Sequence, residues 1–240
     1  MAVTVLQISD THFGPTADQH VSGYHPEGRL GAVIDSWNQT GETADLILLT
    51  GDDTDEGNAD AYARLVIALS SLNAPVLALT GNHDIAEEVV RAFGGADIAE
   101  LGFWRIIGLN SARPNEVHGS VDVVAACELL DALDDRPTVL AIHHPPRSRS
   151  TNPYFQLHGG EELLEALGER PHVKALVSGH LHDAFEFVGP NGLALLGCPS
   201  TLMAIGHEGV TFTIGVDAPT GGRILHLADD GTFTTSLLVA

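Results

Sequence analysis

Short apolar runs, each followed at once by a polar turn, recur along the chain up to about residue 182. Their length and β-branched content are typical of buried strands. These runs cover residues 3–8, 46–49, 76–79, 139–142 and 173–177. Segments with helical periodicity alternate with them, at residues 29–37, 59–72, 85–93, 123–133 and 161–167. This order predicts parallel strands joined by crossover helices.

The pattern changes after residue 183, where Gly, Pro and Asp turns separate shorter strands. These strands are predicted at residues 185–188, 193–196, 210–216, 223–227 and 233–238. Closely spaced strands of this kind favour antiparallel pairing. Two sheets packed face to face, with helices outside, would bury both halves of the chain. Two long polar loops, at residues 14–28 and 146–158, are candidates for functional segments.

The chain has 240 residues, is 44% hydrophobic and shows no break in composition, which predicts a single domain over residues 1–240. No apolar run approaches the roughly 20 residues needed to span a bilayer, and no basic leader precedes the first strand. We therefore expect a cytoplasmic protein without a membrane partner. Cys127 and Cys198 are expected to be reduced and buried. A homodimer is left open.

The chain is strongly acidic, with 32 acidic residues against 11 basic ones and a net charge of −21. Such a field repels polyanions, so long nucleic acids and anionic membranes are poor partners. A small anionic substrate can still bind if the protein holds cations next to the binding site.

Polar blocks of metal-binding character stand directly after the predicted strands. Alternate residues of a strand point to the same side, so Asp10 and His12 can reach one ion, and His180 and His182 can converge in the same way. The candidate metal ligands are Asp10, His12, Asp52, Asn82, His143, His180 and His182. Nitrogen and oxygen donors without cysteine suit Mn, Fe or Zn ions in an open site rather than a structural zinc site.

Two divalent ions about 3.5 to 4 Å apart can clamp a phosphoryl group and lower the pKa of water from about 15.7 toward about 7. Hydrolysis of a phosphoester by a metal-bound hydroxide is the expected reaction, and the two oxygens of Asp52 allow it to bridge the ions. His83 is assigned to stabilising the developing charge or protonating the leaving oxygen, with Asp84 orienting its ring. Together with Asn82 and His83, Arg147 and His207 are candidate substrate contacts.

The blocks DxH, GD, GNHD, H and GHxH, in this order, resemble the calcineurin-like metallophosphoesterase superfamily. The resemblance implies an α/β fold, a four-layer α/β/β/α sandwich of two mixed sheets flanked by helices. It also divides the candidate ligands between two metals that share Asp52. The first metal would be held by Asp10, His12, Asp52 and His182, and the second by Asp52, Asn82, His143 and His180.

Secondary motifs are similar to those of bacterial class III cyclic nucleotide phosphodiesterases, which hydrolyse 3′,5′-cyclic AMP. They are residues 6–12, residues 26–30, the HHPP run at 143–146 and the PST run at 199–201. Asp53 departs from the common pattern, in which an apolar residue follows the bridging Asp.

The resemblance leaves other small substrates open, namely a glycerophosphodiester, a 2′,3′-cyclic nucleotide or a phosphomonoester. A catalytically inactive binding scaffold is disfavoured because no candidate ligand is missing from the blocks. A nuclease is disfavoured by the net charge.

Overall fold

The computed structural model describes residues 2–240, which form two large mixed β-sheets. The five-stranded sheet has the order β15-β14-β1-β2-β3 and the six-stranded sheet the order β10-β11-β9-β7-β5-β4. The first contains β1 (Val3–Ile8), β2 (Leu46–Leu49), β3 (Val76–Ala78), β14 (Gly221–Leu227) and β15 (Phe233–Val239). The second contains β4 (Ile98–Leu101), β5 (Trp104–Leu109), β7 (Thr138–Ile142), β9 (Val173–Ser178), β10 (Glu186–Val188) and β11 (Ala194–Gly197).

Helices cover the outer face of each sheet. The five α-helices in residues 2–240 are α1 (Pro26–Thr40), α2 (Ala59–Leu69), α3 (Ala86–Phe93), α4 (Val123–Asp131) and α5 (Gly160–Gly168). Short 3₁₀ turns are η1 (Ser70–Leu72), η2 (Pro153–Phe155) and η3 (Pro190–Gly192). Two small two-stranded sheets, β6 (Gly119–Ser120) with β8 (Leu157–His158) and β12 (Ile205–Glu208) with β13 (Thr211–Ile214), complete the fold.

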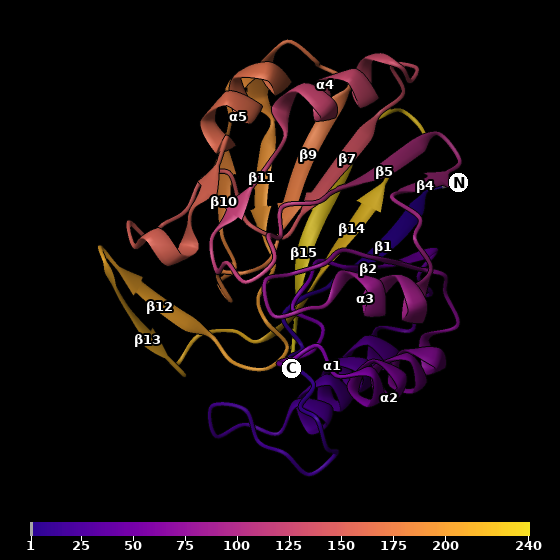
Figure 1. Ribbon diagram of the computed structural model, residues 1–240. Coiled ribbons are helices and arrows are strands. Elements are labelled where there is room, and N and C mark those ends of the chain that lie inside the picture. Colours follow the sequence, from indigo (N-terminus) through magenta and orange to yellow (C-terminus); the bar gives the residue numbers. More distant parts are fainter. Residues whose placement is uncertain (1) are drawn as a thin grey trace.

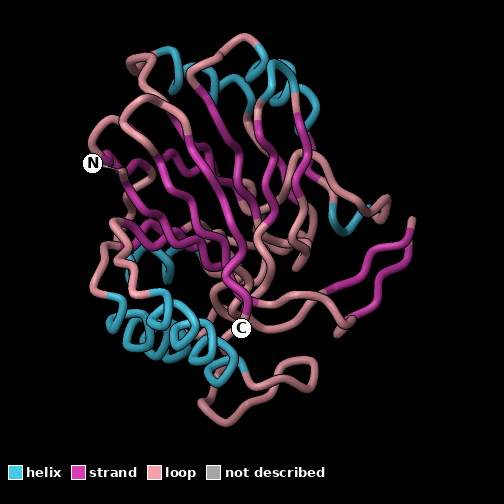
Figure 2. Tube along the Cα trace, turned by 180° about the vertical axis from the view of Figure 1, so that it is seen from behind, coloured by secondary structure: helices cyan, strands magenta, loops and turns pink. Residues whose placement is uncertain are grey.

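Strands that are apolar on both faces explain the layered packing. In β2, Leu46 and Leu48 point into the core between the two sheets, whereas Ile47 and Leu49 pack under α1 and α2. The second sheet repeats this arrangement, with an outer core against α4 and α5. Figure 2 shows the two helical layers on opposite sides of the strands. The predicted four-layer α/β/β/α architecture is confirmed.

Local capping sets where the first helix begins. The His25 side chain accepts a hydrogen bond from Gly28 N at 2.9 Å, and Pro26 occupies the first turn. Both features favour a helix start, so α1 begins at Pro26, earlier than the predicted residue 29.

Some predicted strand pairings are wrong. β11 pairs parallel with β9, so the segment after residue 183 is not one antiparallel sheet. Only β10, β14 and β15 add antiparallel pairs to the two large sheets in that region. The strand predicted at 210–216 is present as β13 and pairs antiparallel with β12, but the two form a separate hairpin outside the large sheets. Strands β4 and β5 were not predicted, because Arg105 interrupts the apolar pattern of β5.

The remaining expectations concern membranes and cysteines. Among residues 2–240, no helix has the length and apolar character to cross a membrane. Cys198 is buried as expected, but Cys127 on α4 is partly exposed, so the prediction of burial is wrong for Cys127. Both thiols are free.

Candidate metal centre

The predicted ligand blocks meet at one edge of the fold, where the carboxyl ends of β1, β2, β3, β7 and β9 converge. Backbone hydrogen bonds tie the loops together. Asp10 N donates to Gly51 O at 3.0 Å, and His12 N donates to Asp52 O at 3.0 Å. Between the two sheets, His180 N donates to the Asp10 carboxylate at 3.1 Å. The backbone segments that carry the ligands come from distant parts of the chain and are therefore held rigidly relative to one another.

The backbone, not strand alternation, aims the paired residues. Strand β1 ends at Ile8, before Asp10 and His12, and β9 ends at Ser178, before His180 and His182. All four residues, and also Asp52, adopt left-handed backbone conformations. Their φ angles are 54° at Asp10, 48° at His12, 53° at Asp52, 67° at His180 and 50° at His182. The predicted convergence is present, but the predicted strand geometry is wrong.

The first group of side chains brings the Nε2 atoms of two imidazole rings close to each other. His12 Nε2 lies 3.1 Å from His182 Nε2, and His182 Nε2 lies 3.4 Å from Asp10 Oδ1. Asp52 Oδ2 is 3.8 Å from His12 Nε2. The Nδ1 atom of His182 donates to Met203 O at 3.0 Å, because a carbonyl can only accept.

In the pair formed by His12 and His182, the His12 ring is oriented by Asp55, because His12 Nδ1 lies 3.3 Å from Asp55 Oδ1. Both Nε2 atoms therefore present lone pairs to each other and to carboxylate oxygens. Lone pairs that converge in this way require a cation between them, so these residues fit a metal ion.

The second group is built on His143. Its Nδ1 donates to Thr50 O at 2.7 Å, which leaves Nε2 facing Asp52 Oδ2 at 3.4 Å and Asn82 Oδ1 at 3.2 Å. The His180 ring centroid lies 5.0 Å from that of His143. Because His180 Nε2 donates to Tyr154 O at 3.2 Å, its Nδ1 keeps the lone pair. Asp52 contacts both groups, as a bridging ligand would.

Electrostatics favour a positive charge between the groups. Burial would raise the pKa of Asp52, but His143 and His12 hold that pKa well below its usual range. Burial would likewise lower the pKa of His143, but the facing carboxylates of Asp52 and Asp10 raise it to about 9. Burial raises the pKa of Asp10 to about 6. Asp52 is ionised and attracts a proton or a metal cation to its neighbours.

The role predicted for Asp84 is wrong. Its carboxylate accepts hydrogen bonds from Tyr62 Oη at 2.8 Å and from Gly81 N at 2.9 Å, and it also accepts from the backbone of residues 53 and 54. It thus joins two ligand loops instead of orienting His83. The His83 ring is held by Asp55, since His83 Nδ1 donates to Asp55 O at 3.0 Å. His83 itself lines the cavity at the centre.

Two candidate substrate residues do not line this cavity. Arg147 pairs with Glu161 at 3.4 Å on the surface. His207 donates from Nε2 to Leu181 O at 2.8 Å, and it does not line the cavity. Arg147 is therefore held at the surface. His207 lies next to the site but outside the cavity lining, because it contacts the backbone between His180 and His182 and its ring centroid lies 4.6 Å from that of Phe155.

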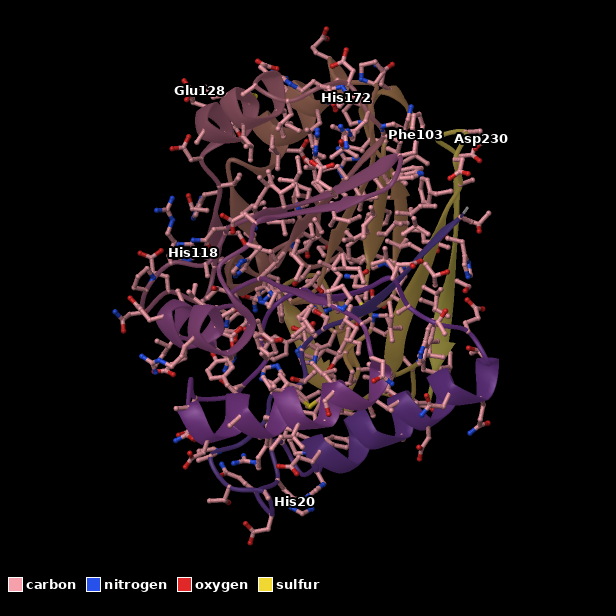
Figure 3. The ribbon with its side chains drawn as sticks, turned by 90° about the vertical axis from the view of Figure 1, so that its right-hand side faces the viewer. His20, Phe103, His118, Glu128, His172 and Asp230 are labelled. Carbon is pink, nitrogen blue, oxygen red and sulfur yellow. The ribbon has the colours of Figure 1, made fainter. Side chains whose placement is uncertain are left out.

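His144 adjoins the centre without a free nitrogen. Its Nδ1 lies 2.8 Å from Ser111 Oγ and its Nε2 lies 3.2 Å from Val117 O. Burial and the neighbouring His143 lower the pKa of His144 to about 3. The ring is neutral and both of its nitrogens have partners, which fits a structural role. Other histidines, such as His20, His118 and His172, lie at separate edges of the molecule (Figure 3).

Two residues at the centre were missed by the sequence analysis. Asp55 contacts the rings of both His12 and His83, although the acidic turn that contains it is typical of a solvated loop. Tyr154, in the polar loop 146–158, lines the cavity and supplies the carbonyl that holds His180. Only the length of that loop indicated a functional segment.

Comparisons with known proteins agree with this geometry. Residues 3–184 match the family model described as calcineurin-like phosphoesterase. The chain is 32% identical to the 3′,5′-cyclic adenosine monophosphate phosphodiesterase CpdA of Escherichia coli strain K12, covering 98% of this chain and 89% of that protein. It is 30% identical to a 3′,5′-cyclic-nucleotide phosphodiesterase of a Nostoc species, covering 99% and 92%.

Solved structures share the fold at low sequence identity. A dimetal phosphatase from Danio rerio superposes with a TM-score of 0.67 at 13% identity, covering 98% of this chain and 99% of that one. A purple acid phosphatase from yellow lupin seeds gives a TM-score of 0.69 at 14% identity, covering 99% of this chain and 52% of that one.

Proposed function

Because this chain belongs to the calcineurin-like phosphoesterase family, we propose that it hydrolyses a 3′,5′-cyclic nucleotide, most directly cyclic AMP, at a dinuclear metal centre. Relatives named as cyclic nucleotide phosphodiesterases match nearly the whole chain, which supports the substrate class. The observation that carries the proposal is the meeting of imidazole lone pairs from His12, His182 and His143 around the carboxylate of Asp52.

Two sets of ligands would hold the ions. Asp10, His12, Asp52 and His182 would bind one, and Asp52, Asn82, His143 and His180 the other. Nitrogen and oxygen donors of this kind suit Mn, Fe or Zn. When bound, such a pair of ions lowers the pKa of water and polarises a phosphoryl group. Hydrogen bonds from Nδ1 of His12, His143 and His182, and from Nε2 of His180, fix the ring orientations before any ion arrives.

The chain's own residues then act on the leaving group. His83 lines the cavity, and its Nδ1 is engaged by Asp55 O at 3.0 Å, so Nε2 is the nitrogen left for the substrate. A proton held on Nε2 would be given to the departing ribose oxygen or would stabilise its charge. Asp55 positions this ring and also fixes the orientation of His12.

We place this activity in the cytoplasm, with a small anionic phosphoester as the partner and neither nucleic acid nor membrane. Light scattering of the purified protein would decide whether two copies associate.

A substrate panel tests the proposal. With Mn²⁺ present, kcat/KM is expected to be at least about tenfold higher for cyclic AMP than for a 2′,3′-cyclic nucleotide, a glycerophosphodiester or a phosphomonoester. Elemental analysis should give about two transition-metal ions per chain. A preference for the monoester would overturn the substrate assignment, although not the family.

The mechanism has its own test. Asp52→Ala should lose metal and slow turnover by more than about 10²-fold, since a direct ligand contributes more than an outer-shell partner. Asp35→Ala, an exposed change on α1, is the matched acidic control and should keep both properties. Full activity in Asp52→Ala would rule out the bridged centre.

A further inference from the structure

The cavity at the metal centre has two unlike walls. It encloses about 200 Å³. One wall is formed by the polar side chains of the centre, among them Asp52, His83 and His180. The other wall, apart from Ser22, is formed by apolar and aromatic residues, namely Val21, Tyr154, Phe155, Met203, Ile205, Phe212 and Ile214. Metal chemistry on a phosphate group accounts for the first wall but not for the second.

Three of these seven side chains, Ile205, Phe212 and Ile214, belong to the β12–β13 hairpin, which projects from the body of the molecule beside the η2 turn (Figure 1). Phe212 and Ile214 occupy alternate positions of β13 and therefore share one face of the hairpin. The Phe212 ring lies 5.3 Å from that of Phe155, edge to face, and 6.2 Å from that of Tyr154.

The side chains of Phe212 and Ile214 are held in place by the hairpin but are partly exposed to solvent. Phe212 is 41% exposed and Ile214 is 46% exposed, although both are large and apolar. Exposed apolar side chains that continue a cavity next to a catalytic centre are typical of a ligand-binding surface.

We infer that this hairpin wall, with Phe212 at its exposed edge, binds the base of the nucleotide substrate while the phosphate lies at the metal centre. The inference rests on the proposed function. Any base presents a flat π-face that stacks on an aromatic ring, and stacking tolerates different bases. Phe212, Ile214 and Met203 offer no side-chain hydrogen-bond donor that would read the edge of a base. The part of the wall next to Phe212 therefore selects for the presence of a base and not for its identity.

Phe212→Ala tests the inference with two matched substrates. One is cyclic AMP, and the other is methyl riboside 3′,5′-cyclic phosphate, in which a methoxy group replaces the base. The variant should lower kcat/KM for cyclic AMP about tenfold, mainly through KM, and should leave the base-free substrate within about twofold. Saturation-transfer NMR should also show the adenine protons of AMP losing contact with the variant.

Val210→Ala is the control, because Val210 lies on the same hairpin, is 64% exposed and does not line the cavity. It should behave like the unmodified protein with both substrates. An equal loss on both substrates in Phe212→Ala, or no loss on either, would overturn the inference alone. Absence of cyclic nucleotide hydrolysis by the unmodified protein would overturn the proposed function and this inference with it.

Discussion

Backbone strain is concentrated at the proposed ligands. Of the nine non-glycine residues with positive φ in residues 2–240, five are proposed ligands. Such conformations cost on the order of 1–3 kcal/mol each and persist where the surroundings enforce them. Here the loops are held by interlocking backbone hydrogen bonds. The sequence indicated which residues would meet but not their backbone conformation. A left-handed conformation at Asp or His does not change the spacing of apolar residues, so the pattern cannot reveal it.

His83 is the residue whose replacement separates acid catalysis from metal binding. His83→Ala removes a ring that lines the cavity but is not among the proposed ligands. We expect the metal content to be unchanged and kcat for cyclic AMP to fall by about 10² to 10⁴-fold. The loss should be much smaller for a p-nitrophenyl diester, whose leaving group needs no proton. Equal losses on both substrates would contradict a role in protonation.

At the scale of the elements, apolar periodicity predicted the strands that carry the ligands and failed where a polar side chain is buried. In β5, Arg105 is almost fully buried because its guanidinium donates to Glu100 at 2.9 Å and Asp134 at 3.1 Å. These partners belong to other segments, so the sequence alone could not show that an arginine belongs inside a strand. The parallel pairing of β11 with β9 was missed for a similar reason, because it depends on a return of the chain through residues 179–193.

Gly81 lies where the loop that carries Asn82 packs closely against the loop that carries Asp52. A Cβ atom at this position would lie 2.1 Å from Asp52 Oδ1 and 2.2 Å from Asp52 N, closer than real contacts allow. Gly81→Ala should therefore displace the bridging carboxylate and weaken metal binding at least about tenfold, measured by competition with a chelator.

Gly31→Ala on α1 is the matched control, since nothing lies within 4 Å of its Cβ position. It should stabilise the fold by about 0.4–1 kcal/mol in denaturant unfolding and leave metal affinity unchanged. Metal affinity of Gly81→Ala equal to that of the unmodified protein would show that the two loops can separate.

The two cysteines report on different layers of the fold. Cys198 is fully buried after β11, and burial raises its thiol pKa well above the usual range, whereas Cys127 on α4 is partly exposed. A thiol reagent should therefore modify one cysteine in the native protein and two after unfolding. Cys127→Ser should abolish the native reaction and Cys198→Ser should preserve it. Equal native reactivity of both thiols would contradict the packing around β11.

On the scale of the whole molecule, the pattern of polar blocks after strands predicted where the centre lies, because parallel strands of the two sheets end at one edge. The resemblance to a known family supplied the ligand sets. Asp55, Tyr154 and the β12–β13 wall could not be predicted, since each reaches the centre through loop geometry that has no sequence period. The long loop 146–158 indicated that a functional segment was present, without showing which residue would enter the site.

The net charge of −21 opposes every anionic substrate, and two bound divalent ions would leave the molecule strongly negative. At about 0.01 M ionic strength the Debye length is near 30 Å, so an approaching phosphoester feels the whole chain, whereas at about 0.15 M it is near 8 Å and only the local cations matter. We therefore expect kcat/KM for cyclic AMP to rise about two- to tenfold over this range, opposite to the fall seen for enzymes that attract their substrates electrostatically. A dianionic phosphomonoester should show a steeper rise than the monoanionic cyclic diester, because repulsion scales with substrate charge. Repeating the series with potassium and choline chlorides separates screening from binding of a particular cation. A fall in kcat/KM with added salt would mean that the positive field of the metal centre, not the acidic surface, governs the approach of the substrate.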